Sequence, residues 1–245
     1  MSDLCKGLGL TQLELALPPL LDAARQQQWT YEVFLDHALQ AEVQGRQERA
    51  RQRRLRAAKL PGNKTLAGFE FGFQPTLNER LIWELADGNF ITTATNVVLL
   101  GPPGVGKTHL ACALSAQAVA SGASALFTTL SQFVEDLGHA PHPSLWRQRL
   151  RRYVTPRVLV LDEIGYTRLT TEQAHFVFEL VTARYEKGAM VLTSNTSFAE
   201  WGTLLGNEVL ATALLDRLLH HAEVITINGP SYRMKDRASP NKLAD

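Results

Sequence analysis

The sequence predicts an α/β domain built on a five-stranded parallel sheet and preceded by a small all-α domain. Three observations predict this fold class. Five short apolar segments alternate with helix-forming segments between residues 76 and 227, which is typical of a parallel sheet with helices on both faces. A glycine-rich loop lies between the first apolar segment and the next helix, as in phosphate-binding folds. Residues 1–63 show helical periodicity instead.

The helical domain, residues 1–63, is predicted to contain two short helices and a long one. Apolar residues recur with helical spacing over 10–28 and are interrupted at Pro18-Pro19, where a second helix is expected to begin with proline in its first turn. Thr30 is the candidate N-cap of a long helix that continues to Leu60. The first half of this helix is apolar and its second half is basic.

The α/β domain is predicted to span residues 64–237, followed by a flexible tail over 238–245. Its first ten residues are rich in Leu and Phe, so we expect them to pack onto the domain as a strap. The expected strands are 96–100, 124–129, 157–162, 189–194 and 223–227. The expected helices are 76–87, 107–121, 131–137, 144–153, 171–187 and 208–220.

Composition excludes several classes of protein. Of 245 residues 45% are hydrophobic, but no apolar run reaches the roughly 18 residues that a membrane span needs. The first residues lack the basic and then apolar pattern of a signal peptide. Cys5 and Cys112 are too few for a disulfide framework and have no zinc-site spacing. We therefore expect a cytoplasmic protein with no membrane partner.

A nucleotide site is predicted at the glycine-rich loop. The segment GPPGVGKT matches the pattern G-x-x-x-x-G-K-[ST]. Its glycines let backbone N–H groups surround a phosphate chain, Lys107 neutralises the terminal phosphates, and the Thr108 hydroxyl binds magnesium. ATP and Mg²⁺ are thus the expected cofactors. The predicted nucleotide-binding residues are Gly101, Pro102, Pro103, Gly104, Val105, Gly106, Lys107, Thr108 and the adjacent His109.

Two carboxylates after the third strand favour a hydrolase over a small-molecule kinase. Asp162 and Glu163 end the apolar run LVL. The first acid is expected to hold Mg²⁺ together with Thr108, and the second to orient or deprotonate an attacking water. A kinase that transfers phosphate to a hydroxyl has no use for the second acid. The alternative is that both acids cap a helix.

Two more polar residues are candidates for catalysis, each with a structural alternative. Asn195 ends the fourth strand, where its amide either bonds the γ-phosphate or the attacking water, or begins a turn. Arg217 lies among the leucines of the helix at 208–220. It either pairs locally or reaches the ATP of a neighbouring subunit as an arginine finger.

These motifs together resemble one family. The segments GPPGVGKT, LVLDEIGY, LTSN, LLDRLLHHA and GPSYRMK are similar to those of the IstB-like helper ATPases of bacterial insertion sequences, relatives of the DnaC helicase loaders within the AAA+ class. The resemblance covers about residues 10–237. It implies an AAA+ core with strand order 5-1-4-3-2 and ATP bound between the subunits of a homo-oligomer. Many AAA+ proteins carry a C-terminal helical lid, but only 18 residues follow Ile227 here, so we expect little or no lid.

The resemblance also implies roles for single residues. Asp162 and Glu163 become the Walker B pair, Asn195 becomes sensor 1, and Arg217 becomes a finger that acts in trans. Arg233 is the candidate for a reduced sensor-2 role. Members of the family hydrolyse ATP, bind duplex DNA when ATP is present, and assist a transposase in target selection.

Charge is segregated along the chain. The whole chain has a net charge of +1, whereas residues 46–59 contain six Arg and one Lys against one Glu. Such a stripe binds DNA phosphates or is a solvated helix face; within the family that the motifs resemble, we expect DNA binding. The predicted DNA-binding residues are Arg46, Arg49, Arg53, Arg54 and Arg56. A second basic cluster at 146–152 either lines a ring or pairs with acids across a subunit interface.

The leading hypothesis is therefore an ATPase that oligomerises on duplex DNA and delivers or marks target DNA for a partner transposase. The alternative is a replicative helicase loader of the DnaC type, because a helical N-terminal domain suits either role.

Overall fold

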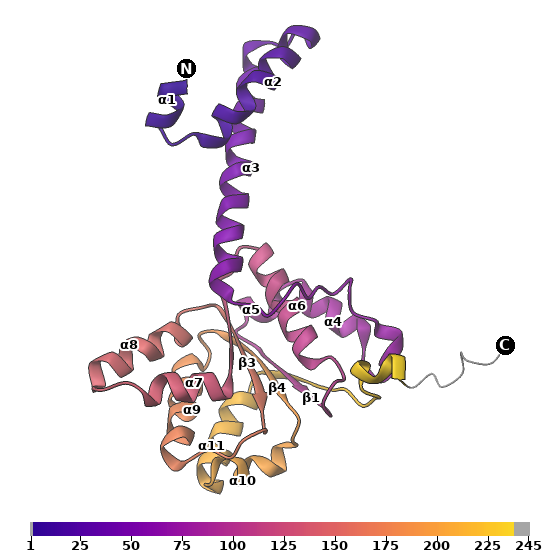
Figure 1. The fold of residues 1–245 in the computed structure, drawn as a ribbon, viewed down its shortest axis with the longest axis vertical. Coiled ribbons are helices and arrows are strands. Elements are labelled where there is room, and N and C mark those ends of the chain that lie inside the picture. Colours follow the sequence, from indigo (N-terminus) through magenta and orange to yellow (C-terminus); the bar gives the residue numbers. More distant parts are fainter. Residues whose placement is uncertain (1, 238–245) are drawn as a thin grey trace, which may run out of the picture. The chain divides into compact units, whose positions relative to one another are not determined.

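The computed structural model describes residues 2–237 and divides the chain into two compact units, residues 1–53 and 54–245 (Figure 1). The division falls within one long helix, α3 (Tyr31–Ala58). The predicted flexible tail, residues 238–245, lies outside the described residues. Within the described part, no helix has the length and apolar character needed to cross a membrane.

The first unit is all helical, with α1 (Ser2–Gly7) and α2 (Thr11–Gln27) preceding α3. The expectation of two short helices over 10–28 is wrong, because α2 continues through Pro18 and Pro19. Proline fixes φ near −65°, which is a helical value. The chain therefore keeps its helical path, although two backbone donors are missing.

Thr30 caps the start of α3. Its hydroxyl accepts the backbone N–H of Val33 at 3.4 Å, which confirms the predicted N-cap.

The first unit buries few side chains. Among residues 2–53, only Cys5, Ala38 and Glu42 are buried. The first unit therefore has a very small core, and one of its members is a carboxylate.

The second unit contains a five-stranded parallel sheet with the order β2-β3-β4-β1-β5. This is the predicted order 5-1-4-3-2 counted from the other edge, so the prediction is confirmed. The strands are β1 (Asn96–Leu100), β2 (Ala125–Thr129), β3 (Val158–Ile164), β4 (Ala189–Ser194) and β5 (Ala222–Thr226).

Helices cover both faces of the sheet (Figure 1). The predicted helices are present as α4 (Glu79–Ala86), α6 (Lys107–Ala120), α7 (Leu130–Gly138), α8 (Pro143–Val154), α9 (Thr171–Arg184) and α11 (Glu208–Leu219). Short elements were not expected, because they hold too few residues to show a period. They are α5 (Asn89–Thr92), α10 (Trp201–Leu205) and the 3₁₀ helices η1 (Phe71–Phe73), η2 (Phe198–Glu200) and η3 (Tyr232–Arg237).

Two hydrophobic clusters form the core of the second unit, one on each face of the sheet. Successive strand residues alternate between them: Val97 belongs to the first cluster and Val98 to the second, as the two-residue period of a strand requires. Leu66 is buried in the first cluster, and Phe69 and Phe71 pack against it. The expected strap is therefore confirmed.

Candidate nucleotide and catalytic site

The site lies where three neighbouring strands end. Since β3, β4 and β1 are adjacent and parallel, their carboxyl ends bring together the segments that follow them. A cavity of about 230 Å³ opens there, and Lys107, Thr108, Glu163 and Asn195 all line it. The structure thus brings these sequence-predicted residues together.

The glycines of the loop after β1 are required by both backbone and space. Gly104 and Gly106 have φ values of 84° and 102°, in the left-handed region that favours glycine. A Cβ at Gly104 would collide with Ser231, and one at Gly106 would collide with Phe69. The loop is therefore enclosed by the strap on one side and the C-terminal segment on the other.

Lys107 is the first residue of α6 and is only 8% exposed. Its Nζ donates hydrogen bonds to the carbonyl oxygens of Gly101 at 2.6 Å and Pro102 at 2.8 Å. Burial lowers the pKa of the ammonium; the negative charge of Asp162 opposes this shift, and the positive charge of Arg233 adds to it. A phosphate chain in the loop supplies the anionic partner that a buried ammonium needs.

The oxygen ligands expected for Mg²⁺ are already in contact. The Thr108 hydroxyl donates to Oδ1 of Asp162 at 2.9 Å, and Asp162 is only 3% exposed. A hydroxyl and a carboxylate at the phosphate loop form a hard-oxygen donor set of the kind that Mg²⁺ prefers. The residues present therefore fit a nucleoside triphosphate with Mg²⁺.

Glu163 differs from its neighbour Asp162 because it is exposed and lines the cavity. Its φ is 65°, a left-handed value that costs a non-glycine residue about 1–2 kcal/mol. This backbone conformation occurs at the residue predicted to activate water. The geometry therefore places an ionisable carboxylate at the cavity next to a buried one.

Asn195 has an unused hydrogen-bonding atom at the cavity. Its backbone N–H donates to the carbonyl of Ile164 at 3.3 Å, while its side-chain Oδ1 is buried and has no partner within residues 2–237. A buried polar atom without a partner is rare in native proteins and calls for an explanation. A water or ligand group bound in the cavity would give Asn195 that partner.

Further walls of the cavity come from the strap and the C-terminal segment. Arg233, the candidate for a reduced sensor-2 role, lines the cavity there, and so do Glu70 and Tyr232, which were not predicted. The Tyr232 hydroxyl donates to Glu70 at 2.7 Å, and Lys235 pairs with the same carboxylate. The backbone N–H of Tyr232 donates to the carbonyl of Gly104 at 2.9 Å. His109, predicted as a nucleotide-binding residue, lines the cavity, and its Nε2 contacts the carbonyl of Thr65 at 2.8 Å.

Arg217 lies elsewhere in the second unit. It does not line the cavity but a separate hollow with Tyr185 and Glu186. Its Nη1 donates to the carbonyl of Ala213 at 2.9 Å, and its guanidinium lies 4.9 Å from the centroid of the Phe178 ring. The structure therefore does not bring Arg217 to the nucleotide cavity of its own chain.

A possible metal-binding group lies beside this hollow. Glu186, His220 and His221 each offer a ligand atom within 4.8 Å of the others, and all three are exposed. Both histidine side chains are 53% exposed. Sequence spacing missed the group because Glu186 lies on a different segment.

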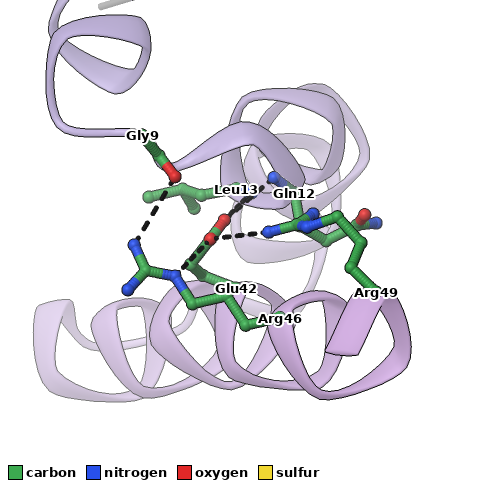
Figure 2. Close-up of polar contacts among 6 residues, drawn as sticks. All are labelled: Gly9, Gln12, Leu13, Glu42, Arg46 and Arg49. Carbon is green, nitrogen blue, oxygen red and sulfur yellow. Dashed lines mark hydrogen bonds and ion pairs between the residues drawn. The ribbon is translucent and has the colours of Figure 1, made fainter. Parts of the chain in front are cut away.

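The predicted DNA-binding arginines fall into two classes. Figure 2 shows the first class: Nε of Arg46 and Nη2 of Arg49 bind Oε1 of the buried Glu42, at 2.8 and 3.1 Å. The other carboxylate oxygen of Glu42 accepts the backbone N–H groups of Gln12 and Leu13, at 2.8 and 2.9 Å. These two arginines thus help to join α3 to the start of α2.

The remaining arginines of the stripe make fewer contacts. Arg53 and Arg56 are exposed, and neither forms an ion pair within the described residues. Arg54 is half-buried, and its Nε has no partner there. Arg53 and Arg56 therefore offer the more accessible charges.

The second basic cluster is partly paired within the chain. Arg149 and Arg152 of α8 lie 3.7 and 3.3 Å from carboxylate oxygens of Asp136 in α7. The Tyr153 hydroxyl donates to Asp136 at 2.6 Å. Pairing with an acid thus accounts for two of the arginines, and the acid belongs to the same chain.

Comparison with known sequences gives one family and close relatives. The family of IstB-like ATP binding proteins matches residues 3–240. An insertion sequence IS21 protein of Pseudomonas aeruginosa, named as ATP-binding, is 44% identical over 96% of this chain and 89% of its own length. The corresponding IS5376 protein of Geobacillus stearothermophilus is 42% identical over 85% of this chain and 83% of its own.

Solved structures share the fold at low sequence identity. The DnaC helicase loader has a TM-score of 0.50 at 23% identity, covering 61% of this chain and 87% of that one. AMPPCP-bound DnaA from Aquifex aeolicus has a TM-score of 0.58 at 18% identity, covering 73% of this chain and 54% of that one. What they share with this chain is the fold, an α/β core built on a parallel sheet.

Proposed function

We propose a function from the premise that the chain belongs to the family of IstB-like ATP binding proteins. The chain hydrolyses ATP, oligomerises on duplex DNA, and delivers or marks target DNA for a partner transposase. The insertion-sequence relatives support the role in transposition, since they match nearly the whole chain.

The observation that best supports ATPase activity is the exposed carboxylate of Glu163, which lines the cavity beside the Thr108–Asp162 contact. A carboxylate in this place can accept a proton from water as the water attacks the γ-phosphate. Lys107 and the backbone N–H groups of the loop hold the phosphates, and the Asn195 amide orients the water or the γ-phosphate. Thr108 and Asp162 would hold Mg²⁺, which would offset negative charge on the phosphate oxygens.

Arg217 is proposed to complete the site of a neighbouring subunit. Its place outside the cavity of its own chain supports action in trans. We expect Arg217→Ala and Glu163→Gln each to be inactive alone, and their mixture to regain part of the ATPase rate. Mixed oligomers contain interfaces with an intact Glu163 on one side and an intact Arg217 on the other, whereas a finger acting in cis gives no recovery.

DNA binding is proposed for the basic half of α3. Arg53 and Arg56 support it most directly, because they are exposed and form no ion pair within the described residues. Phosphate contacts of this kind give affinity without base specificity. The residues proposed to hold DNA are thus distinct from those that line the nucleotide cavity.

The test is the steady-state ATPase rate with and without duplex DNA, at several protein concentrations. We expect hydrolysis to rise with DNA and with oligomer formation. Affinity capture with a purified transposase and with a purified replicative helicase separates the two partner classes. Saturable binding to the helicase and none to the transposase would favour a helicase loader instead.

A further inference from the structure

We propose that Thr193 is a positioning residue for hydrolysis: its hydroxyl holds Glu163 and Asp162 in their catalytic arrangement. Thr193 lies at the end of β4, is 2% exposed, and has no part in the predicted site. The inference rests on the proposed ATPase function and adds a residue to that same site.

The need for a positioning residue arises from the register of the sheet. Leu161 of β3 pairs with Leu192 of β4, and Ile164 pairs with Ser194. Three steps along β3 therefore correspond to two steps along β4, which is the signature of a β-bulge. The extra residue lies in the Asp162–Glu163 segment, so this part of β3 is out of step with the regular ladder.

The Thr193 side chain takes the place of a regular ladder hydrogen bond. Its Oγ1 accepts the backbone N–H of Glu163 at 3.1 Å. Because Glu163 has a left-handed φ of 65°, its conformation persists only where the surroundings hold it. The hydrogen bond from the Glu163 N–H to Thr193 therefore stabilises this backbone conformation.

The same hydroxyl also holds the neighbouring carboxylate. Thr193 donates its proton to Oδ1 of Asp162, the oxygen that also accepts from Thr108. A hydroxyl has one proton to donate and lone pairs to accept with, so Thr193 uses both capacities on adjacent residues. It thereby fixes the proposed metal ligand and the proposed water-activating residue relative to each other.

The hydroxyl can be removed without a change of shape. Thr193→Val keeps the β-branched form that suits a buried strand, and we expect kcat to fall by about 10- to 100-fold, the scale of a misplaced catalytic group. The affinity for ATP should stay within about twofold of wild type, because the phosphate loop is unaltered. Thr193→Ser retains the hydroxyl and should recover most of the activity.

A matched control is available on another strand of the sheet. Thr128 is 4% exposed on β2, its hydroxyl donates to the carbonyl of Thr129, and it does not line the nucleotide cavity. Thr128→Val therefore removes a buried hydroxyl at the same cost to packing. Its ATPase rate should match that of wild type.

A double-variant cycle tests whether Thr193 acts through Glu163. In a Glu163→Gln background, single-turnover hydrolysis should lose little more when Thr193→Val is added, because the group being positioned is already disabled. Equal losses in both backgrounds would overturn the proposal.

Two more outcomes would overturn it. One is a Thr193→Ser variant whose kcat falls by about 10- to 100-fold relative to wild type, the loss expected for Thr193→Val. This comparison with wild type does not require the valine variant to fold. The other is a loss from Thr128→Val as large as that from Thr193→Val. Failure of the proposed function itself is distinguishable, since wild-type protein would then show no hydrolysis of ATP.

Discussion

The nucleotide cavity and the arginine stripe of α3 are both rich in charged groups, but the fold treats them differently. At the cavity, Lys107 of α6 and the adjacent acids Asp162 and Glu163 of β3 meet at one edge of the sheet. Along α3 the arginines stay spread over one helix, and Arg46 and Arg49 are already paired with Glu42.

The difference shows what each sequence pattern can predict. A motif at the end of a buried parallel strand fixes where its side chains go, because every neighbouring strand ends at the same edge. A run of basic residues on a helix fixes only the charge. Which arginines are available depends on the acids that the tertiary structure brings to them.

The largest expected effect separates chemistry from binding. Glu163→Gln should lower the ATPase rate by about 10²- to 10⁴-fold, the contribution of a general base, while ATP still binds. Arg53→Glu with Arg56→Glu should leave the DNA-free ATPase rate nearly unchanged. Steady-state ATPase assays and titration with a fluorescent ATP analogue measure both effects.

If Arg53→Glu with Arg56→Glu lowers the DNA-free ATPase rate as much as Glu163→Gln does, the nucleotide cavity and the arginine stripe act as one site. That result would contradict their separate roles.

A smaller effect distinguishes arginines within the stripe. Arg53→Ala with Arg56→Ala should weaken binding to duplex DNA and reduce the slope of log affinity against log salt by about 1.8, which is about 0.9 for each phosphate that is no longer neutralised. Arg46→Ala with Arg49→Ala should change the slope less, because these side chains already bind Glu42. Fluorescence anisotropy over a range of salt concentrations measures the slopes.

Equal slope changes for the two pairs would show that Glu42 releases its arginines to DNA at no net cost. Unchanged affinity and slope in both would identify the stripe as a solvated face.

The smallest expected effect concerns pH. Chiefly through the hydrogen bond from Arg46, the pKa of Glu42 is lowered to about 2. A carboxyl with a lowered folded pKa stabilises the fold above its unfolded pKa, and this stabilisation is lost as pH falls. The stabilisation by Glu42 should thus be complete above its ordinary pKa of 4.5 and disappear toward pH 2, and Glu42→Gln should remove this part of the pH dependence of Tm.

Glu48 is the matched control for Glu42. Its pKa is also lowered to about 2, chiefly through the hydrogen bond from Arg51, but its side chain is 54% exposed against 5% for Glu42. Because salt screens an exposed pair more than a buried one, the effect of Glu48→Gln on Tm should vanish at high salt and that of Glu42→Gln should persist. Thermal melts of the full chain at low and high salt compare them.

The sequence predicts the parts of the fold that leave a regular apolar pattern, and it misses the parts that do not. Apolar runs predicted every strand and the strand order followed from the family resemblance, because a covered parallel sheet leaves a strong pattern. The helix through Pro18 and Pro19 was not predicted, since proline usually marks a helix start but also tolerates a helical φ. Short elements such as α5 hold too few residues to show a period.

The candidate site divides in the same way. The loop at Gly101–Thr108 and the acids at Asp162 and Glu163 were predicted from local motifs, and the structure brings them together. Thr193 and Glu42 were not predicted, because each matters only through partners that are distant in sequence. A single sequence contains no signal for such pairings.

The most direct test of the central proposal is the affinity of the Glu163→Gln protein for duplex DNA with ATP compared with ADP. This variant is expected to bind ATP without hydrolysing it, so the ATP state persists during the titration. At one fixed salt concentration, we expect affinity with ATP to exceed that with ADP by about tenfold or more, a typical scale for coupling between two sites. Equal affinities, or no DNA binding with ATP present, would contradict a nucleotide-controlled DNA helper.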